Sequence, residues 1–210
     1  VINIEEYAMT AERVIGQVAL IQRVMDSIMK KDEHYGTIPG CKKPSLLKPG
    51  AEKLSVTFRL VPRYEVFQNE YENGHREFRV TCTLIHAPTG QFYGEGVGSC
   101  STLEGKYRFR TGEVELTGKP VPSEYWKDRD IKLIGGKGFV TKKNPDTGKW
   151  EIARQGERIE HDNPADYYNT VLKMAKKRAH VDAVLTATAA SDIFTQDVED
   201  MPEVIPGAAE

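Results

Sequence analysis

Hydrophobic positions near the N-terminus recur at the spacing of a helix. They fall at steps of four and three residues, which places them on one helix face, and they are Val14, Val18, Ile21, Met25 and Ile28. The pattern predicts an amphipathic helix over 10–31 with Thr10 as its N-cap. The stretch 34–50 is rich in glycine and proline and predicts a loop, and a short helix is expected over 51–60.

Alternating positions then predict an antiparallel meander of three strands. The clearest strand is 76–85, whose apolar face carries Phe78, Val80, Cys82 and Leu84. We expect flanking strands at 64–71 and 91–101, joined to it by turns at Asn73-Gly74 and at Pro88-Thr89-Gly90.

The third strand of this meander carries glycine at alternate positions, Gly94, Gly96 and Gly98, all on one face. Glycine weakens a strand, so we expect another element to approach its backbone there. The segment 163–194 predicts that element: one long helix, begun by Asn163 and Pro164. Its alanines repeat every fourth residue and form a narrow stripe, Ala175, Ala179, Ala183 and Ala187. Beside the stripe lies a basic cluster: Lys173, Lys176, Lys177 and Arg178.

The segment 105–162 separates the third strand from the long helix and is interpreted as an insertion. It predicts a hairpin from 138–143 to 149–154, and Trp126 and Trp150 are expected to be buried in its small core. The whole pattern predicts an α+β fold, with one domain over 1–195 and an acidic tail over 196–210.

Composition excludes several classes of protein. The chain is 39% hydrophobic and 29% charged, as in globular proteins. It has no apolar run near the length of about 18 residues that spans a bilayer, so we expect a cytoplasmic protein that does not contact membranes. Cys41, Cys82 and Cys100 are too few and too scattered for a disulfide framework.

Charge is unevenly distributed although the net charge is only −2. The segment 30–63 contains eight Lys and Arg and three Asp and Glu, and the segment 105–154 contains twelve and seven. The segment 192–210, in contrast, contains six Asp and Glu and no Lys or Arg. Such a chain can bind an anion locally and remain soluble.

Enzyme motifs are incomplete. The run Gly135-Gly136-Lys137-Gly138 lacks the hydroxyl residue and the earlier glycine of a phosphate loop, and the histidines show no metal-ligand spacing. We therefore expect no catalytic site, cofactor or metal. The positive signal is the interleaving of rings and cations in 106–110 and 125–127, a pattern typical of proteins that bind single-stranded nucleic acid. Tyr107 and Phe109 fit the buried face of a strand equally well.

Three segments resemble the single-strand annealing proteins, which include the eukaryotic annealing domain of the Rad group and the phage Red-beta, RecT and Sak types. They are LLKPGAEKL at 46–54, the glycine-bearing strand, and KMAKKRAHVDAVL at 173–185. The last resembles the Met-Ala-Lys-Lys helix of RecT-type proteins. The resemblance covers roughly 46–101 and 164–194, and leaves the insertion outside it.

The resemblance implies a β-β-β-α core, homo-oligomeric rings or filaments, and ATP-independent annealing of complementary strands in recombination and repair, in a phage or prophage protein. The eukaryotic domain has a Lys-Arg pair further along the long helix, where this chain has Leu185, Thr186 and Ala187. The DNA contacts are therefore expected elsewhere, at Lys42, Lys43, Lys48, Lys53, Lys106, Arg108, Arg110, Lys173, Lys176, Lys177 and Arg178. The acidic tail is expected either to recruit a single-strand binding protein or exonuclease, or to screen the groove.

Two other functions remain open at this stage. A metal-dependent nuclease acting on recombination intermediates would use Glu52, Lys53 and acids such as Glu95. A scaffold would form rings through the first helix and the sheet edges without contacting DNA.

Overall fold

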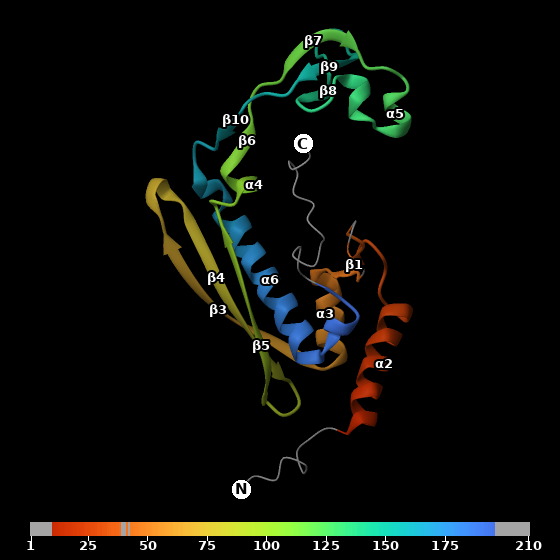
Figure 1. Ribbon diagram of the computed structural model, residues 1–210. Helices are drawn as coiled ribbons and strands as arrows, with labels where there is room; N and C mark the ends of the chain where they lie inside the picture. Colours follow the sequence, from red (N-terminus) through yellow and green to blue (C-terminus); the bar gives the residue numbers. More distant parts are fainter. Residues whose placement is uncertain (1–9, 39–40, 42, 196–210) are drawn as a thin grey trace, which may run out of the picture. The chain divides into compact units, whose positions relative to one another are not determined.

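The computed structural model describes residues 10–38, 41 and 43–195 (Figure 1). The fold is mixed α+β with antiparallel sheets, as the sequence predicts. The described residues form two compact units, the first made of 10–72, 76–101 and 168–195 and the second of 73–75 and 102–167. The predicted insertion lies wholly in the second unit.

The first unit is organised by a three-stranded antiparallel sheet with strands in the order β3 (Leu60–Glu70), β4 (Arg76–His86) and β5 (Phe92–Ser101). The β3–β4 turn contains η1 (Glu72–Gly74), where Asn73 adopts a positive φ. One face of the sheet is covered, and the residues predicted for that face on β4 are buried: Phe78, Val80, Cys82 and Leu84.

Helix α6 (Tyr168–Thr188) packs against β5 and β4. It is shorter than the predicted 163–194, because η3 (Pro164–Tyr167) precedes it and Ala189 ends it with a φ of 55° before η4 (Ala190–Asp192). Asn163, predicted to cap the long helix, instead precedes η3, where its Oδ1 accepts a hydrogen bond from the Ala165 nitrogen at 3.1 Å.

The glycine face of β5 meets the alanine stripe of α6, as predicted. A β-carbon on Gly96 would collide with the backbone nitrogen of Ala183, and one on Gly98 would collide with that of Ala179. A β-carbon on Gly94 would lie 2.8 Å from the Ala187 methyl. Small residues on both elements therefore bring the helix backbone against the strand.

Two side chains of α6 also satisfy the backbone of β5, an edge strand of this sheet. The Oδ2 of Asp182 accepts a hydrogen bond from the Val97 nitrogen at 2.8 Å. The Arg178 guanidinium donates to the carbonyl of Ser99. Backbone groups that would otherwise depend on water at the sheet edge are thus paired with the helix.

Helix α2 (Ala11–Ser27) starts at the predicted cap, where the Oγ1 of Thr10 accepts from the Arg13 nitrogen at 3.4 Å. It ends before the predicted Lys31. Its Ile21 and Val24 are buried, and the Gln17 amide donates to the Thr188 carbonyl at 2.9 Å, at the end of α6.

Helix α3 (Lys48–Thr57) begins earlier than the predicted 51–60, because a proline fits the first turn of a helix and Pro49 supplies it. The loop before it is expected to be irregular but contains a short pair of strands, β1 (Tyr35–Gly36) and β2 (Ser45–Leu46). The Leu46 nitrogen donates to the Thr195 carbonyl at 2.9 Å, which joins this loop to the end of the described chain.

The second unit holds two small antiparallel sheets. One pairs β6 (Phe109–Thr111) with β10 (Arg158–Glu160), next to the short helix α4 (Gly105–Arg108). The other has the order β7 (Glu115–Pro120), β9 (Trp150–Arg154), β8 (Phe139–Lys143). Between β7 and β8 lie α5 (Tyr125–Asp128) and η2 (Ile131–Ile134). The hairpin from β8 to β9 is the predicted one.

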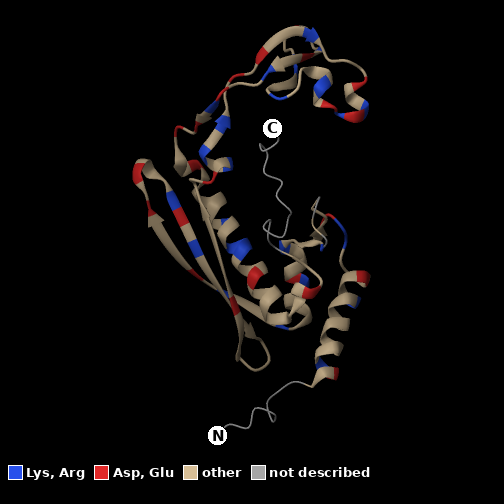
Figure 2. Cartoon of the chain, in the orientation of Figure 1, with Lys and Arg blue, Asp and Glu red and all other residues tan. Residues whose placement is uncertain are grey.

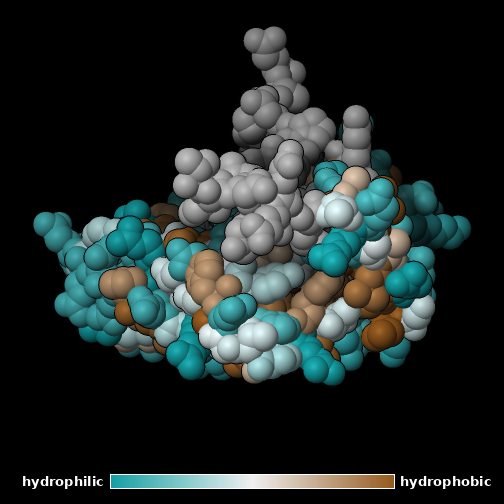
Figure 3. All heavy atoms as spheres, turned by 90° about the horizontal axis from the view of Figure 1, so that it is seen from below, coloured by the Kyte–Doolittle hydropathy of each residue, from teal (hydrophilic) through white to brown (hydrophobic). Residues whose placement is uncertain are grey.

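The expected burial of the two tryptophans is wrong. Trp126 is 37% exposed and Trp150 is 47% exposed, so neither is a core residue. The physical reason is the size of the unit: beside its three-stranded sheet the buried apolar residues are few, such as Ala153 of β9 and Ile134 of η2, which leaves too small a core for two indole rings. Exposed apolar residues are also present elsewhere on the protein, and Figure 3 shows hydrophobic residues at several separate places among hydrophilic ones.

Candidate nucleic-acid interface

The packing of α6 against the sheet determines where its basic side chains lie. Because Ala175, Ala179 and Ala183 face the sheet, the residues next to them in sequence point toward the flanks of the helix. Figure 2 shows basic residues along α6. Lys173 and Lys176 lie on the flank that faces α3 and β3, where they line a pocket.

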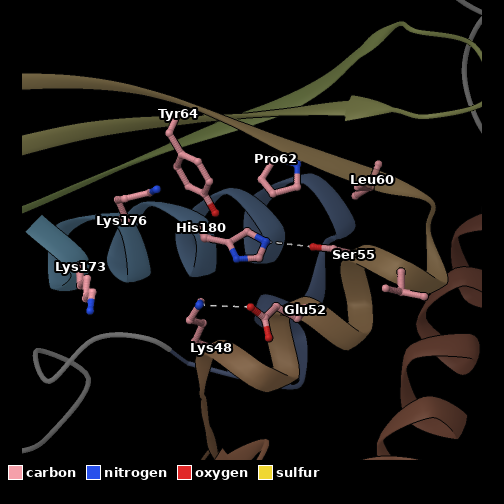
Figure 4. Close-up of a pocket in the computed structure, with 10 residues that line it drawn as sticks. Lys48, Glu52, Ser55, Leu60, Pro62, Tyr64, Lys173, Lys176 and His180 are labelled. Atoms are coloured by element: carbon pink, nitrogen blue, oxygen red, sulfur yellow. Dashed lines mark hydrogen bonds and ion pairs between the residues drawn. The ribbon is translucent and has the colours of Figure 1, made fainter.

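The pocket has a volume of about 390 Å³ and lies between α3, β3 and α6, all in the first unit (Figure 4). Lys48 and Glu52 of α3 form one wall and are joined by an ion pair of 3.3 Å. The other lining residues are Ser55, Val56, Leu60, Pro62, Tyr64, Lys173, Lys176 and His180. Three lysines and one carboxylate therefore line the pocket, which has an excess of positive charge.

Tyr64 lines the pocket, and its ring contacts the side chains of Lys176 and His180. The Nζ of Lys176 lies 4.4 Å from the ring centroid, and the His180 ring meets it edge-on with centroids 6.4 Å apart. Burial, with smaller contributions from Cys82 and Glu52, raises the pKa of Tyr64 to about 12. Tyr64 is therefore a neutral phenol at physiological pH, and its ring attracts a cation by its electron-rich face.

His180 is buried beside the pocket and has one unpaired nitrogen. Its Nε2 lies 3.0 Å from the Oγ of Ser55, while its Nδ1 is buried with no hydrogen-bond partner. Burial lowers the pKa of His180 below its usual value; Glu52 opposes this and Lys48 adds to it. The ring is therefore neutral at pH 7.

The Ser55–His180 pair does not form a catalytic triad among the residues that the structure describes. A triad needs an acid to orient the second histidine nitrogen, and the Nδ1 of His180 has no such partner. Ser55 itself is only 5% exposed, so a substrate has little access to its hydroxyl.

Other predicted contact residues are distributed differently. Lys177 and Arg178 line a smaller hollow with Ser45, Leu46, Leu47 and Val181, and Arg178 is engaged with β5. The Nζ of Lys43 donates to the Ser191 carbonyl at 2.7 Å. Lys53 is exposed on α3 and is not among the pocket residues. Lys42 lies outside the described residues.

The three predicted cations of the second unit each pair with an acid of that unit. The Nε of Arg108 donates to Glu160 at 2.6 Å, Arg110 donates to Asp162 at 3.1 Å, and Lys106 lies 3.7 Å from Glu104. Tyr107, which alternates with them in sequence, is buried rather than open to a base. An incoming phosphate would have to compete with these carboxylates.

The acids considered for a nuclease do not meet. Glu52 is paired with Lys48 at the pocket, on the α6 side of the sheet. Glu95 alternates with Gly94 and Gly96 on β5 and is exposed on the opposite face. In the described part of the chain, no group of three or more His, Cys, Asp and Glu residues is placed to hold a metal ion.

The residues that sequence reasoning missed are Tyr64, Ser55 and His180. Ser55 and His180 are 125 positions apart, so no spacing motif relates them. Comparison with family models, with curated proteins and with solved structures finds no match for the chain. Within the described residues, no helix combines the length and the apolar character needed to cross a membrane.

Proposed function

We propose that this protein binds single-stranded DNA and anneals complementary strands without ATP. The observation that carries the proposal is the convergence of Lys48, Lys173 and Lys176 on one pocket beside the ring of Tyr64. Cations that follow phosphates, together with a ring able to stack on a base, are the usual means of holding single strands.

The resemblance to single-strand annealing proteins adds support from the sequence. Its three segments contribute to α3, β5 and α6, which belong to one unit; α3 and α6 line the pocket, and β5 packs against α6. A β-β-β-α core, which the resemblance implies, is in keeping with the order of β3, β4, β5 and α6 along the chain.

The proposed mechanism is electrostatic. Two DNA strands repel each other through their phosphates, and a row of lysines lowers that repulsion while leaving the base edges free to pair. Base pairing supplies the free energy, so neither a nucleotide nor a metal is needed. Under this proposal many protomers form a ring or filament. The exposed apolar side chains of Val61, Phe67 and Val97, which alternate outward from the covered face of the sheet, offer surface for such self-association.

The deciding experiment is annealing of two complementary labelled oligonucleotides in the absence of ATP and magnesium. We expect the wild type to accelerate annealing and Lys173→Ala/Lys176→Ala to lose most of that acceleration. The matched control is Arg13→Ala/Arg23→Ala, which removes the same charge from exposed positions on α2. Circular dichroism and sedimentation of each variant separate loss of binding from loss of fold or of oligomer.

Other outcomes would favour the two remaining functions. Magnesium-dependent shortening of the labelled strands would indicate a nuclease. Sedimenting oligomers that do not shift a labelled oligonucleotide would indicate a scaffold. Recruitment of a single-strand binding protein or exonuclease by the acidic tail, 196–210, also remains a proposal, since the tail lies outside the described residues.

A further inference from the structure

A cluster of aromatic rings lies on the surface of the second unit. The ring centroids of Trp126 and Trp150 are 5.3 Å apart, and those of Tyr125 and Trp126 are 5.4 Å apart, both edge-to-face. The Arg129 guanidinium lies 4.9 Å from the Trp126 ring centroid and 5.7 Å from that of Tyr125. Rings of α5 and β9 are thereby joined into one cluster.

The two indoles are exposed but held in place. The Trp150 carbonyl accepts a hydrogen bond from the Val121 nitrogen at 3.1 Å, which fixes its backbone beside the end of β7. Arg129 ends α5 with a φ of 54°, in the left-handed region, with its guanidinium near the rings. With about half of its surface open, Trp150 offers a ring that packs edge-on against Trp126 and is still accessible to a ligand.

Cations lie on the same sheet face as Trp150. Lys143 of β8 is its direct cross-strand partner. Lys119 of β7 pairs with Ile152, two positions along β9, and so shares that face. Over 115–154 the chain has nine Lys and Arg against six Asp and Glu, so this stretch carries a net positive charge although the whole chain does not.

We propose that Trp126 and Trp150 form a stacking platform for single-stranded nucleic acid, with Lys119 and Lys143 contacting its phosphates. The assignment of this nucleic acid as DNA and not RNA rests on the proposed function. Fixed, exposed rings stack on bases of any sequence, and flanking lysines hold the backbone. An apolar peptide would use the same rings but would gain nothing from the lysines, so the charge favours a nucleic acid.

Trp126 and Trp150 are the chain's two tryptophans, so intrinsic fluorescence reports on this platform directly. We expect an oligothymidylate to quench the fluorescence saturably, and an abasic oligomer of the same length to quench it far less, because it has phosphates but no bases. An oligouridylate tests the sugar: equal quenching assigns the platform to single strands of either kind, and weaker quenching assigns it to DNA.

Variants test the rings themselves. Trp150→Leu should weaken binding of the oligothymidylate about tenfold, whereas Trp150→Phe, which keeps a ring, should retain most of it. Leu133→Ala, at another exposed apolar residue of the second unit, should bind as the wild type does. Retained fluorescence of Trp126 and an unchanged circular dichroism spectrum show that the Trp150→Leu variant is folded.

Three results would overturn the platform: no quenching by the oligothymidylate, equal quenching by the abasic oligomer, or quenching by an apolar peptide alone. Annealing measured in the same samples separates this inference from the proposed function. Annealing without quenching would contradict the stacking platform and leave the pocket lined by Lys48, Lys173 and Lys176 as the proposed DNA site. Quenching without annealing keeps the platform and removes the annealing proposal.

Discussion

The backbone of Ala183 occupies the place that a side chain on Gly96 would need. Gly96→Ala should therefore destabilise the protein by about 1–3 kcal/mol, because α6 would have to move away from β5. Urea unfolding followed by circular dichroism measures this, whereas tryptophan fluorescence would report the other unit. Gly36→Ala is the control, since nothing lies within 4 Å of a β-carbon there. Equal stability of the two variants would mean that the close packing is not needed.

Salt dependence should identify the lysines that contact phosphates. Removing one such lysine, as in Lys173→Gln, should lower the slope of log affinity against log salt by about 0.7 for single-stranded DNA. Arg13→Gln, on exposed α2, should leave the slope as in the wild type. The measurement is fluorescence anisotropy of a labelled oligonucleotide over a salt series. An unchanged slope for Lys173→Gln would show that this lysine does not contact a DNA phosphate.

Arg108 should matter less to DNA binding than Lys173 does. Its guanidinium already pairs with Glu160, and that carboxylate would compete with phosphate. Arg108→Ala should therefore change the affinity by less than Lys173→Ala, and Glu160→Gln should raise it if Arg108 can reach DNA. Binding assays at equal salt compare the three. A larger loss in Arg108→Ala than in Lys173→Ala would place the main contact in the second unit.

His180 should make the protein less stable in acid. Since burial holds the pKa of His180 in the folded state below its usual value of about 6.5, the unfolded state binds the proton more readily. Its contribution to stability is thus fully present above pH 6.5 and declines as the pH falls toward the folded-state pKa. Unfolding free energies measured between about pH 7.5 and pH 5 should fall more steeply for the wild type than for His180→Gln. Parallel curves would contradict this.

The packing of α6 on β5 could be predicted because both periodicities are local. Glycine at every second residue and alanine at every fourth define one face each, and two faces of small residues fit each other. The ends of the helices are predicted less accurately than their packing. Sequence pattern extended α2 to Lys31, since Ile28 continues the apolar spacing, but Ile28 is exposed and the helix ends at Ser27.

The pocket could be predicted only in part. Lys173 and Lys176 are expected because they belong to the basic cluster on α6, and Lys48 because it belongs to the basic loop predicted over 34–50. Tyr64 and Ser55 had no local signal, since their roles come from elements that meet only in the folded chain. Burial of the aromatic residues could not be predicted reliably: Tyr107, for which both alternatives are open, is buried, whereas Trp126 and Trp150, expected to be buried, are exposed. Hydrophobicity alone does not say whether a small unit has room for a large ring.

Asp182, which accepts a hydrogen bond from β5, and Arg178, which donates one to it, affect which backbone groups of the sheet are available to another chain. They occupy backbone groups of Val97 and Ser99 on one edge of the sheet β3-β4-β5. The opposite edge, along β3, has no strand beside it within the described residues. The two edges of the sheet therefore differ, because a strand of another molecule could not pair with β5 at these two positions unless the side chains of Asp182 and Arg178 first released the backbone.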